Sequence, residues 1–158
     1  MRRIASGLLG LFVVSAGCAR QAASPKKASD PDLIQFRLVE DAAKPDTVPL
    51  KQRGKDEALH VQKEALLNGS AVQSVKVERG PDGRPTIVLR FAQEGGKRFA
   101  EITGANVGKR LGIIVAGELI TAPVIRSAVS GHAVITGMFT EPEARDLAAT
   151  IRSAISPR

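Results

Sequence analysis

The stretch from Val72 to Phe91, VQSVKVERGPDGRPTIVLRF, decides the fold class of this chain. Val75 and Val77 alternate with polar residues in its first half, and Ile87, Leu89 and Phe91 recur at every second position in its second half. Alternation with a period of two places apolar side chains on one face of a strand. The Gly-Pro-Asp-Gly sequence between the halves is typical of a turn. The stretch therefore predicts a β-hairpin with one buried face.

The hydrophobic period changes directly after this hairpin. Phe99, Ile102 and Asn106 have the spacing of one helical face, which predicts a helix from Glu94 to Val107. Gly108 follows at the position where a C-terminal helix cap is common. We therefore expect a helix to pack on the hairpin that precedes it.

A second helix is predicted near the end of the chain. The sequence from Thr140 to Glu143, Thr-Glu-Pro-Glu, is typical of a capping box with Pro in the first helical turn. Leu147, Ile151 and Ile155 then recur every four residues and form an apolar stripe.

Shorter apolar runs outside these segments predict further strands. Residues 41–57 are polar and contain three Pro or Gly residues, so we expect a loop there, and residues 58–67 fit a strand or a short helix equally well. The sequence therefore predicts an α+β fold, with two helices packed on a largely antiparallel sheet. The additional strands are expected at Leu33–Glu40, Leu111–Val115, Leu119–Thr121 and Ala133–Thr136.

The first 18 residues have the pattern of a signal peptide. Arg2 and Arg3 supply the positive start, and the segment from Ile4 to Val14 is apolar. This apolar segment is shorter than the roughly 20 residues that a membrane-spanning helix needs. The small residues that precede Cys18 resemble a bacterial lipobox.

Cys18 is the only cysteine, and we predict it as the site of lipid attachment. Ser15 stands where a lipobox usually has Leu, so ordinary cleavage after Ala16 or Ala19 remains the alternative. Residues 19–31 are rich in Ala, Ser, Lys and Pro and lack periodicity, which predicts a flexible tether. The folded domain is expected at residues 32–158, and lipid chains would hold it at a membrane surface.

Composition and motifs exclude several classes of function. Aromatic residues make up only 3% of the chain, which argues against nucleic-acid binding by base stacking. His60 and His132 lie far apart and no ligand spacing accompanies them, so we predict no metal and no cofactor. No catalytic motif is present either, and we predict that the chain is not an enzyme. The net charge of +7 fits a solvated basic surface, or attraction to anionic lipid or polymers of the envelope.

Several short segments between Gly83 and Ile155 follow one another in a distinctive order. They are Arg84–Glu94, Gly96–Thr103, Asn106–Leu111, Ile120–Ile125, Ile135–Gly137, Phe139–Thr140 and Glu143–Ala148. Together they resemble the head of the first periplasmic domain of the protein-export subunit SecD. The head-like part covers residues 83–155, and the segment from Phe36 to Val39 is similar to the strand that opens the family's periplasmic domain.

The sequence departs from the family pattern at three points. Ala116 stands before the Gly of a tight turn where the family usually has Asp, and Met138 stands where the family often has Asn. In the family, the last head helix leads to six transmembrane helices that use a proton gradient together with SecF. This chain ends at Arg158, and we therefore expect that it is not the energised subunit itself.

The resemblance implies a non-catalytic binding module on the periplasmic side of the cell envelope. Its expected partners are protein, namely exported polypeptide or subunits of the translocase, together with the membrane surface through the lipid anchor. The alternative is a general envelope lipoprotein that reuses the fold for an unrelated envelope partner.

An apolar surface beside an interrupted strand is the candidate site for a protein partner. Pro123 lacks an N–H group and should leave neighbouring backbone groups free, while Val124 and Ile125 add apolar area. Met138 and Phe139 precede the second helix and are expected nearby. The alternative is that these residues belong to the core, with Phe139 packed under the capping box.

Overall fold

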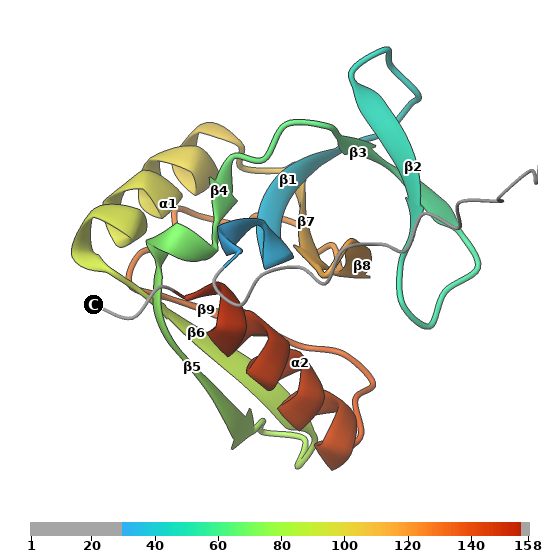
Figure 1. Ribbon diagram of the computed structural model, residues 1–158. Coiled ribbons are helices and arrows are strands. Elements are labelled where there is room, and N and C mark those ends of the chain that lie inside the picture. The colour runs from blue at the N-terminus through green and yellow to red at the C-terminus, as the bar shows by residue number, and fades with distance from the viewer. Residues whose placement is uncertain (1–29, 156–158) are drawn as a thin grey trace, which may run out of the picture.

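The structure, a computed structural model, describes residues 30–155 and contains two antiparallel sheets and two α-helices (Figure 1). The predicted signal peptide, Cys18 and nearly all of the predicted tether lie outside the described residues. The elements in chain order are the 3-10 turn η1 (Pro31–Leu33), β1 (Ile34–Glu40), β2 (Thr47–Lys51), β3 (Ala58–Gln62), β4 (Leu67–Asn68), the 3-10 turn η2 (Gly69–Ala71), β5 (Val72–Arg79), β6 (Pro85–Phe91), α1 (Gln93–Ala105), β7 (Arg110–Val115), β8 (Glu118–Thr121), β9 (His132–Ile135) and α2 (Glu141–Ala154).

The strands form a larger and a smaller sheet. The larger sheet has the order β2-β3-β1-β7-β8, with β4 paired to the other end of β1. The smaller sheet has the order β5-β6-β9, and its β5–β6 pair is the hairpin predicted at residues 72–91. All pairings between the named strands are antiparallel, so the predicted α+β class with a largely antiparallel sheet is confirmed.

The main core lies between the two sheets and the helices. Ile34, Phe36 and Leu38 point into it from β1, since alternate residues of a strand share a face. The rings of Phe36 and Phe91 each contact the ring of Phe99 on α1, at centroid distances of 5.5 and 4.5 Å. Three of the four phenylalanines within residues 30–155 are therefore concentrated where the two sheets and α1 meet.

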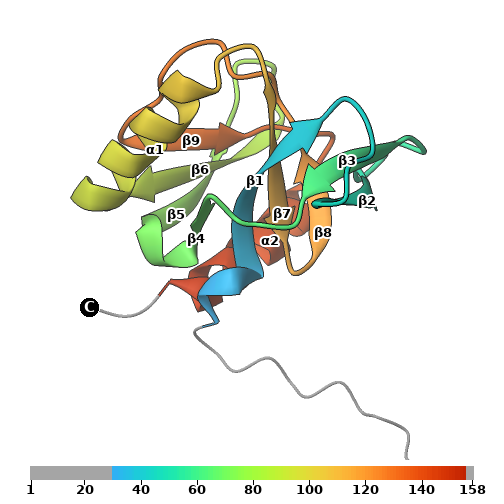
Figure 2. The same ribbon diagram turned by 90° about the horizontal axis from the view of Figure 1, so that it is seen from above.

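A second, smaller core lies on the opposite face of β1 and β7. Val39 and Ile114 point into it from those strands, and Leu119 of β8 is fully buried there. The hairpin formed by β2 and β3 curls over this face, as Figure 2 shows, and Gln52 after β2 bridges to Leu119. The larger sheet therefore bends partway towards a barrel around the smaller core.

The prediction of a loop at residues 41–57 is wrong for its central part, because β2 occupies Thr47–Lys51. Pro49 lies inside this strand opposite His60 of β3. Pro is tolerated here because β2 is the terminal strand of the sheet order, where the absent N–H group costs no ladder hydrogen bond. The ambiguous segment at 58–67 begins with strand β3.

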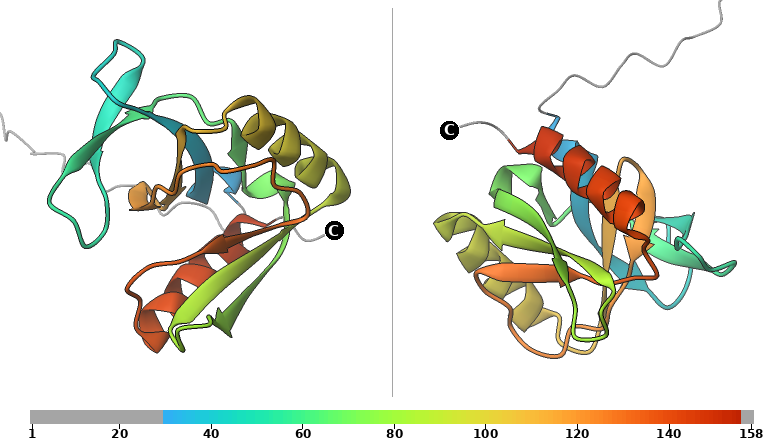
Figure 3. Two further views of the ribbon diagram at one scale, coloured as in Figure 1. Left: turned by 180° about the vertical axis from the view of Figure 1, so that it is seen from behind. Right: turned by 90° about the horizontal axis from the view of Figure 1, so that it is seen from below.

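Both predicted helices are present. The capping box of α2 has both its hydrogen bonds, with Thr140 N–H donating to Glu143 Oε2 at 2.8 Å and Glu143 N–H donating to Thr140 Oγ1 at 3.5 Å. Helix α1 ends two residues before the predicted Val107, and Gly108 adopts a positive φ of 89° just after it. Figure 3 shows α2 lying along the smaller sheet.

The turn between β7 and β8 contains the Ala116 at which the sequence departs from the family pattern. Ala116 and Gly117 have φ values of 51° and 87°. A two-residue hairpin turn with positive φ at both central positions matches the twist of the strands but favours Asn, Asp or Gly. The alanine therefore occupies a strained position.

Candidate functional site

A groove of about 360 Å³ lies where β9, α1 and the segment after β8 meet, and we call it the edge groove. Phe99 and Thr103 of α1 line it, together with Leu111 and Ile113 of β7. Its remaining lining comes from residues 123–127, Val129 and residues 132–134. The floor of the groove is therefore part of the main core, and its walls are the irregular segment after β8 and the short strand β9.

The first wall is the segment that follows β8. Leu111 N–H donates to Pro123 C=O at 2.9 Å, and Ile125 N–H donates to Lys109 C=O at 2.8 Å. The segment thus pairs with the start of β7 around an isolated bridge between Arg110 and Val124. Ile125 points into the main core and is 6% exposed, whereas Val124 on the opposite face is 52% exposed.

Thr103 fixes the loop that leads from this wall to β9. Its side chain is buried on α1, and its hydroxyl donates to Phe99 C=O at 2.7 Å and accepts from Val129 N–H at 2.8 Å. Sequence analysis missed this residue. The sequence does contain one sign of this role, because Thr103 lies four residues after Phe99 inside the predicted helix. A Thr hydroxyl at such a position often donates a hydrogen bond to the carbonyl group of the preceding helical turn.

The second wall is β9, which among residues 30–155 pairs only with β6 and is an edge strand of the smaller sheet. Val134 lies at its centre and is 45% exposed, although it is a branched apolar residue. Sequence analysis predicted the strand but assigned no role to Val134. The alternation of side chains identifies which face a residue occupies, but not which strand is left without a neighbour.

The lining of the edge groove contains one positively charged side chain. Among the described residues, Arg126 and His132 line the groove and no Asp or Glu does. The groove therefore offers an apolar surface, and the guanidinium of Arg126 would repel a cationic occupant.

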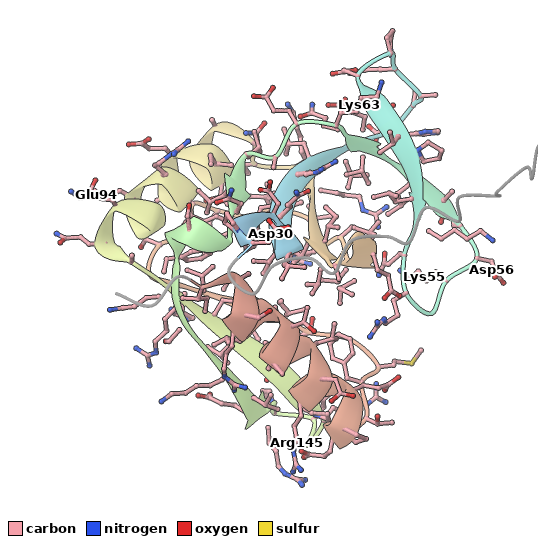
Figure 4. The ribbon with its side chains drawn as sticks, in the orientation of Figure 1. Asp30, Lys55, Asp56, Lys63, Glu94 and Arg145 are labelled. Atoms are coloured by element: carbon pink, nitrogen blue, oxygen red, sulfur yellow. The ribbon has the colours of Figure 1, made fainter. Side chains whose placement is uncertain are left out.

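Met138 and Phe139 line a different cavity of about 600 Å³, which we call the turn cavity. It lies between residues 52–55 after β2, residues 82 and 84 of the β5–β6 turn, and the start of α2. Figure 4 shows Lys55 and Asp56 on the loop that joins β2 to β3, and Lys55 lines the cavity. Met138 is 81% exposed, whereas Phe139 is buried in the main core.

The turn cavity is bordered by paired charges. Arg53 Nε donates to Glu118 Oε1 at 2.9 Å, and this hydrogen bond lowers the pKa of the Glu118 carboxyl. The backbone N–H of Thr140 likewise lowers the pKa of the Glu143 carboxyl by hydrogen bonding to it. These carboxylates are held ionised by local partners, an arrangement that stabilises the turn and the helix start.

The candidate residues are thus divided between two depressions. Pro123, Val124 and Ile125 line the edge groove, whereas Met138 and Phe139 line the turn cavity. Pro123, Val124 and Met138 are exposed by more than a third of their surface, whereas Ile125 and Phe139 are buried. A shared binding surface for all five therefore lacks support from their placement, and a role for each in partner binding stays a prediction.

The described residues contain no group of three or more His, Cys, Asp or Glu side chains arranged to hold a metal ion. Within residues 30–155, no helix is both long enough and apolar enough to cross a membrane.

The fold and the groove define an α+β domain of two antiparallel sheets with an apolar depression at an open sheet edge. The family described as "SecDF, P1 head subdomain" matches residues 46–155, and the chain belongs to this family. It therefore resembles the periplasmic head of SecD, a domain linked to protein export.

Curated relatives and solved structures agree with this assignment. The chain is 34% identical over 140 residues to the protein translocase subunit SecDF of Thermus thermophilus, covering 79% of this chain and 19% of that protein. It is 35% identical over 113 residues to SecD of Elusimicrobium minutum, covering 71% of this chain and 24% of that protein. The chain thus spans about a fifth to a quarter of the length of these relatives.

Among solved structures, one of SecDF, described as a membrane component that enhances protein export, superposes with a TM-score of 0.63 at 31% identity, covering 80% of this chain and 64% of that chain. A crystal structure of SecDF in a super-membrane-facing form gives a TM-score of 0.62 at 31% identity, covering 79% of this chain and 19% of that chain.

Proposed function

We propose that this chain is a non-catalytic binding module of the cell envelope that assists protein export by contacting polypeptide in transit. The observation that carries the proposal is the edge groove, where the exposed Val124 and Val134 border an apolar depression beside an open strand edge. Exposed branched apolar side chains around a groove are typical of a surface that meets a protein partner. The relatives are named protein translocase subunits, which supports a partner within the export process.

The position of the groove fits a module that is held at its N-terminal end. Figures 2 and 3 show the loop that leads into β9 at the end of the molecule opposite to the start of β1. The start of β1 lies beside the end of α2, since a Cβ atom at Gly69 would lie within about 3 Å of both Pro31 and Ala154. An anchor before residue 30 would therefore be attached at the end of the molecule opposite to the edge groove.

The proposed anchor is lipid attached to Cys18 on the periplasmic side. Replacing Cys18 with Ser should release the protein from the membrane fraction into the soluble fraction, because no acyl chain would then bury its methylene groups in the bilayer. The measurement is fractionation followed by N-terminal sequencing. A wild-type protein that is already soluble and begins at Gly17 or Arg20 would contradict the anchor and leave the groove unaffected.

The test of the proposed function is site-specific photo-crosslinking in cells that export a stalled precursor. A photoreactive amino acid at Val124 should crosslink to the precursor, because that side chain projects from the groove wall. The matched control is the same amino acid at Glu64, which is also exposed but lines neither depression. Crosslinks that are absent at Val124, or equal at both positions, would overturn the proposal. So would exclusive recovery of an unrelated envelope protein.

A further inference from the structure

The backbone of β9 has a free edge at Val134. Phe91 N–H donates to Gly131 C=O at 2.9 Å, which makes these two residues a hydrogen-bonded pair at the start of the β6–β9 ladder. In an antiparallel ladder such pairs alternate with pairs whose backbone groups point outward. Ala133 therefore points its N–H and C=O towards β6, and Val134 points both groups away from it. Within residues 30–155 no hydrogen bond satisfies the Val134 backbone.

The segment after β8 has a second free edge, at Val124. The hydrogen bonds that define its bridge to β7 are made by the residues on either side, Pro123 and Ile125. Val124 is therefore the non-hydrogen-bonded member of its pair, and its own N–H and C=O point away from β7. In the described part of the chain these two groups also have no hydrogen-bond partner.

Both free edges border the same groove. Val124 lines the edge groove from its first wall and Val134 from its second wall, and these residues are 52% and 45% exposed. A free strand edge forms hydrogen bonds with any extended chain, because the donors and acceptors of the backbone are the same in every sequence. The floor between the two edges is apolar and is formed by Phe99, Leu111 and Ile113.

We propose that the edge groove binds an extended polypeptide segment as an added β-strand, held by the backbone groups of Val134 on one side and of Val124 on the other. This inference rests on the proposed function and specifies how the groove recognises a chain in transit. One residue of the added strand would pair with Val134. Its neighbours, whose backbone groups point the other way, would pair with Val124.

The lining of the groove also selects among extended segments. Arg126 and His132 line it and no carboxylate does, so an acidic or uncharged segment is favoured over a basic one. The apolar floor favours branched apolar side chains at alternate positions of the segment, because these are the side chains that would point into the groove. The expected occupant is an extended segment in which Val, Ile or Leu alternates with polar or acidic residues.

The direct test uses a labelled nine-residue peptide in which Val alternates with Thr and a Glu stands at each end, with the full chain as the receptor. Methylating the backbone nitrogens of every second residue removes the donors along one edge and should weaken binding roughly tenfold. Methylating the backbone nitrogens of all residues, which removes the donors along both edges, should abolish measurable binding. A peptide with Lys in place of Glu should bind more weakly at low salt. Fluorescence anisotropy measures each affinity, and equal affinity for all the methylated peptides would overturn the proposal.

A matched pair of variants tests the receptor side. Val134→Pro removes the outward N–H and needs no change in the pairing with β6, since Pro is accepted on an edge strand. Val134→Ala shortens the side chain and keeps the N–H. Val134→Pro should lower the affinity for the peptide at least fivefold more than Val134→Ala does, and both variants should keep melting temperatures close to that of the wild type. Equal weakening by the two variants would show that only the side chain matters and would overturn strand addition.

Failure of this inference can be distinguished from failure of the proposed function. A permanently reduced, unfolded protein serves as the second probe, with the same full-length variants. If it binds the wild type and Val134→Pro equally well, polypeptide binding stands and strand addition at β9 is overturned. If the unfolded protein binds neither the wild type nor Val134→Pro, and the crosslinks at Val124 are also absent, the proposed function fails together with the inference.

Discussion

The paired strands β1 and β7 separate two apolar regions that differ in what holds them together. On one face, the main core joins both sheets and both helices and contains three mutually contacting phenylalanine rings. On the other face, the smaller core has only aliphatic side chains and is covered by the β2–β3 hairpin. That cover is fastened to β8 by the Gln52–Leu119 bridge and by the pair of Arg53 with Glu118.

This difference shows which part of the molecule carries the candidate site. Phe99 and Leu111 belong to the main core and also form the floor of the edge groove. The smaller core contributes no residue to that groove. We therefore expect the hairpin over the smaller core to open locally at a lower free energy than the groove does.

The largest effect is expected from Phe99→Ala. Phe99 is 3% exposed and contacts the rings of Phe36 and Phe91, so its removal leaves a cavity at the centre of the main core. The free energy of unfolding should fall by about 3–5 kcal/mol. Chemical denaturation measures this loss, with Val107→Ala as the exposed control that should change stability by less than about 0.5 kcal/mol. A loss below about 1 kcal/mol would mean that the ring cluster does not organise the main core.

Leu119→Ala tests the smaller core directly. Leu119 is fully buried and packs close to Gly112 across the β7–β8 pair. We expect a loss of about 2–3 kcal/mol, which is less than for Phe99 because a small core can close partly over the cavity. Hydrogen exchange should accelerate for the amides of β2 and β3 and stay slow for α1. Equal acceleration in both regions would show that the two cores unfold as one unit, and the comparison would fail.

Thr103→Val probes the side-chain hydrogen bond that positions the loop between the segment after β8 and β9. The replacement keeps the shape of the side chain but leaves the N–H of Val129 without its acceptor, at a cost of about 1–3 kcal/mol. Thr103→Ser keeps the hydroxyl and is the control for the loss of the hydrogen bond. The amide of Val129 should exchange much faster in Thr103→Val than in Thr103→Ser. Unchanged exchange would show that the loop is held by its apolar contacts alone.

The smallest effect is expected at the ion pair of Arg53 with Glu118, which joins the β2–β3 hairpin to β8, and this effect depends on pH. Hydrogen bonding to Arg53 lowers the pKa of Glu118 in the folded state. Its stabilisation is therefore fully present above the unfolded pKa of about 4.3 and is lost as the pH falls through the lower folded value. Both side chains are at least a third exposed, so solvent screening limits the contribution to less than about 1 kcal/mol.

The measurement is the difference in unfolding free energy between the wild type and Arg53→Ala at neutral pH and at a pH well below the folded pKa of Glu118. The difference should be present at neutral pH and vanish in acid. A difference that persists unchanged in acid would mean that Arg53 acts through packing of its aliphatic stem and not through its charge.

Local signals made most of the fold predictable. The hairpin at residues 72–91 and the capping box at Thr140 depend on neighbours within a few positions, and both are present. Strand β2 was missed because Pro49 and its polar surroundings are typical of a loop, and only the distant pairing with β3 makes the segment a strand. Local patterns contain no information about such a partner.

The same limit applies to the candidate site. The sequence placed Val124 at an exposed interruption because Pro123 is a local signal, and this residue does line the groove. Met138 and Val124 were expected together, yet they line different depressions, because their separation depends on how two sheets pack. Val134 was missed since its exposure follows from the strand order, in which β9 has no second neighbour.

The pairing of β1 with β7 has a consequence for how the chain reaches its fold. Ile34 pairs with Val115, which lies 81 residues later in the chain, so one edge of the central strand of the larger sheet has no partner until β7 is present. Closing so long a loop costs conformational entropy before the β1–β7 contacts form, and this cost makes folding slow. During synthesis β1 emerges early and keeps an unpaired, apolar edge until β7 follows. The newly made chain of this module therefore exposes a free strand edge of the same kind as the one that we infer it binds with in the folded state.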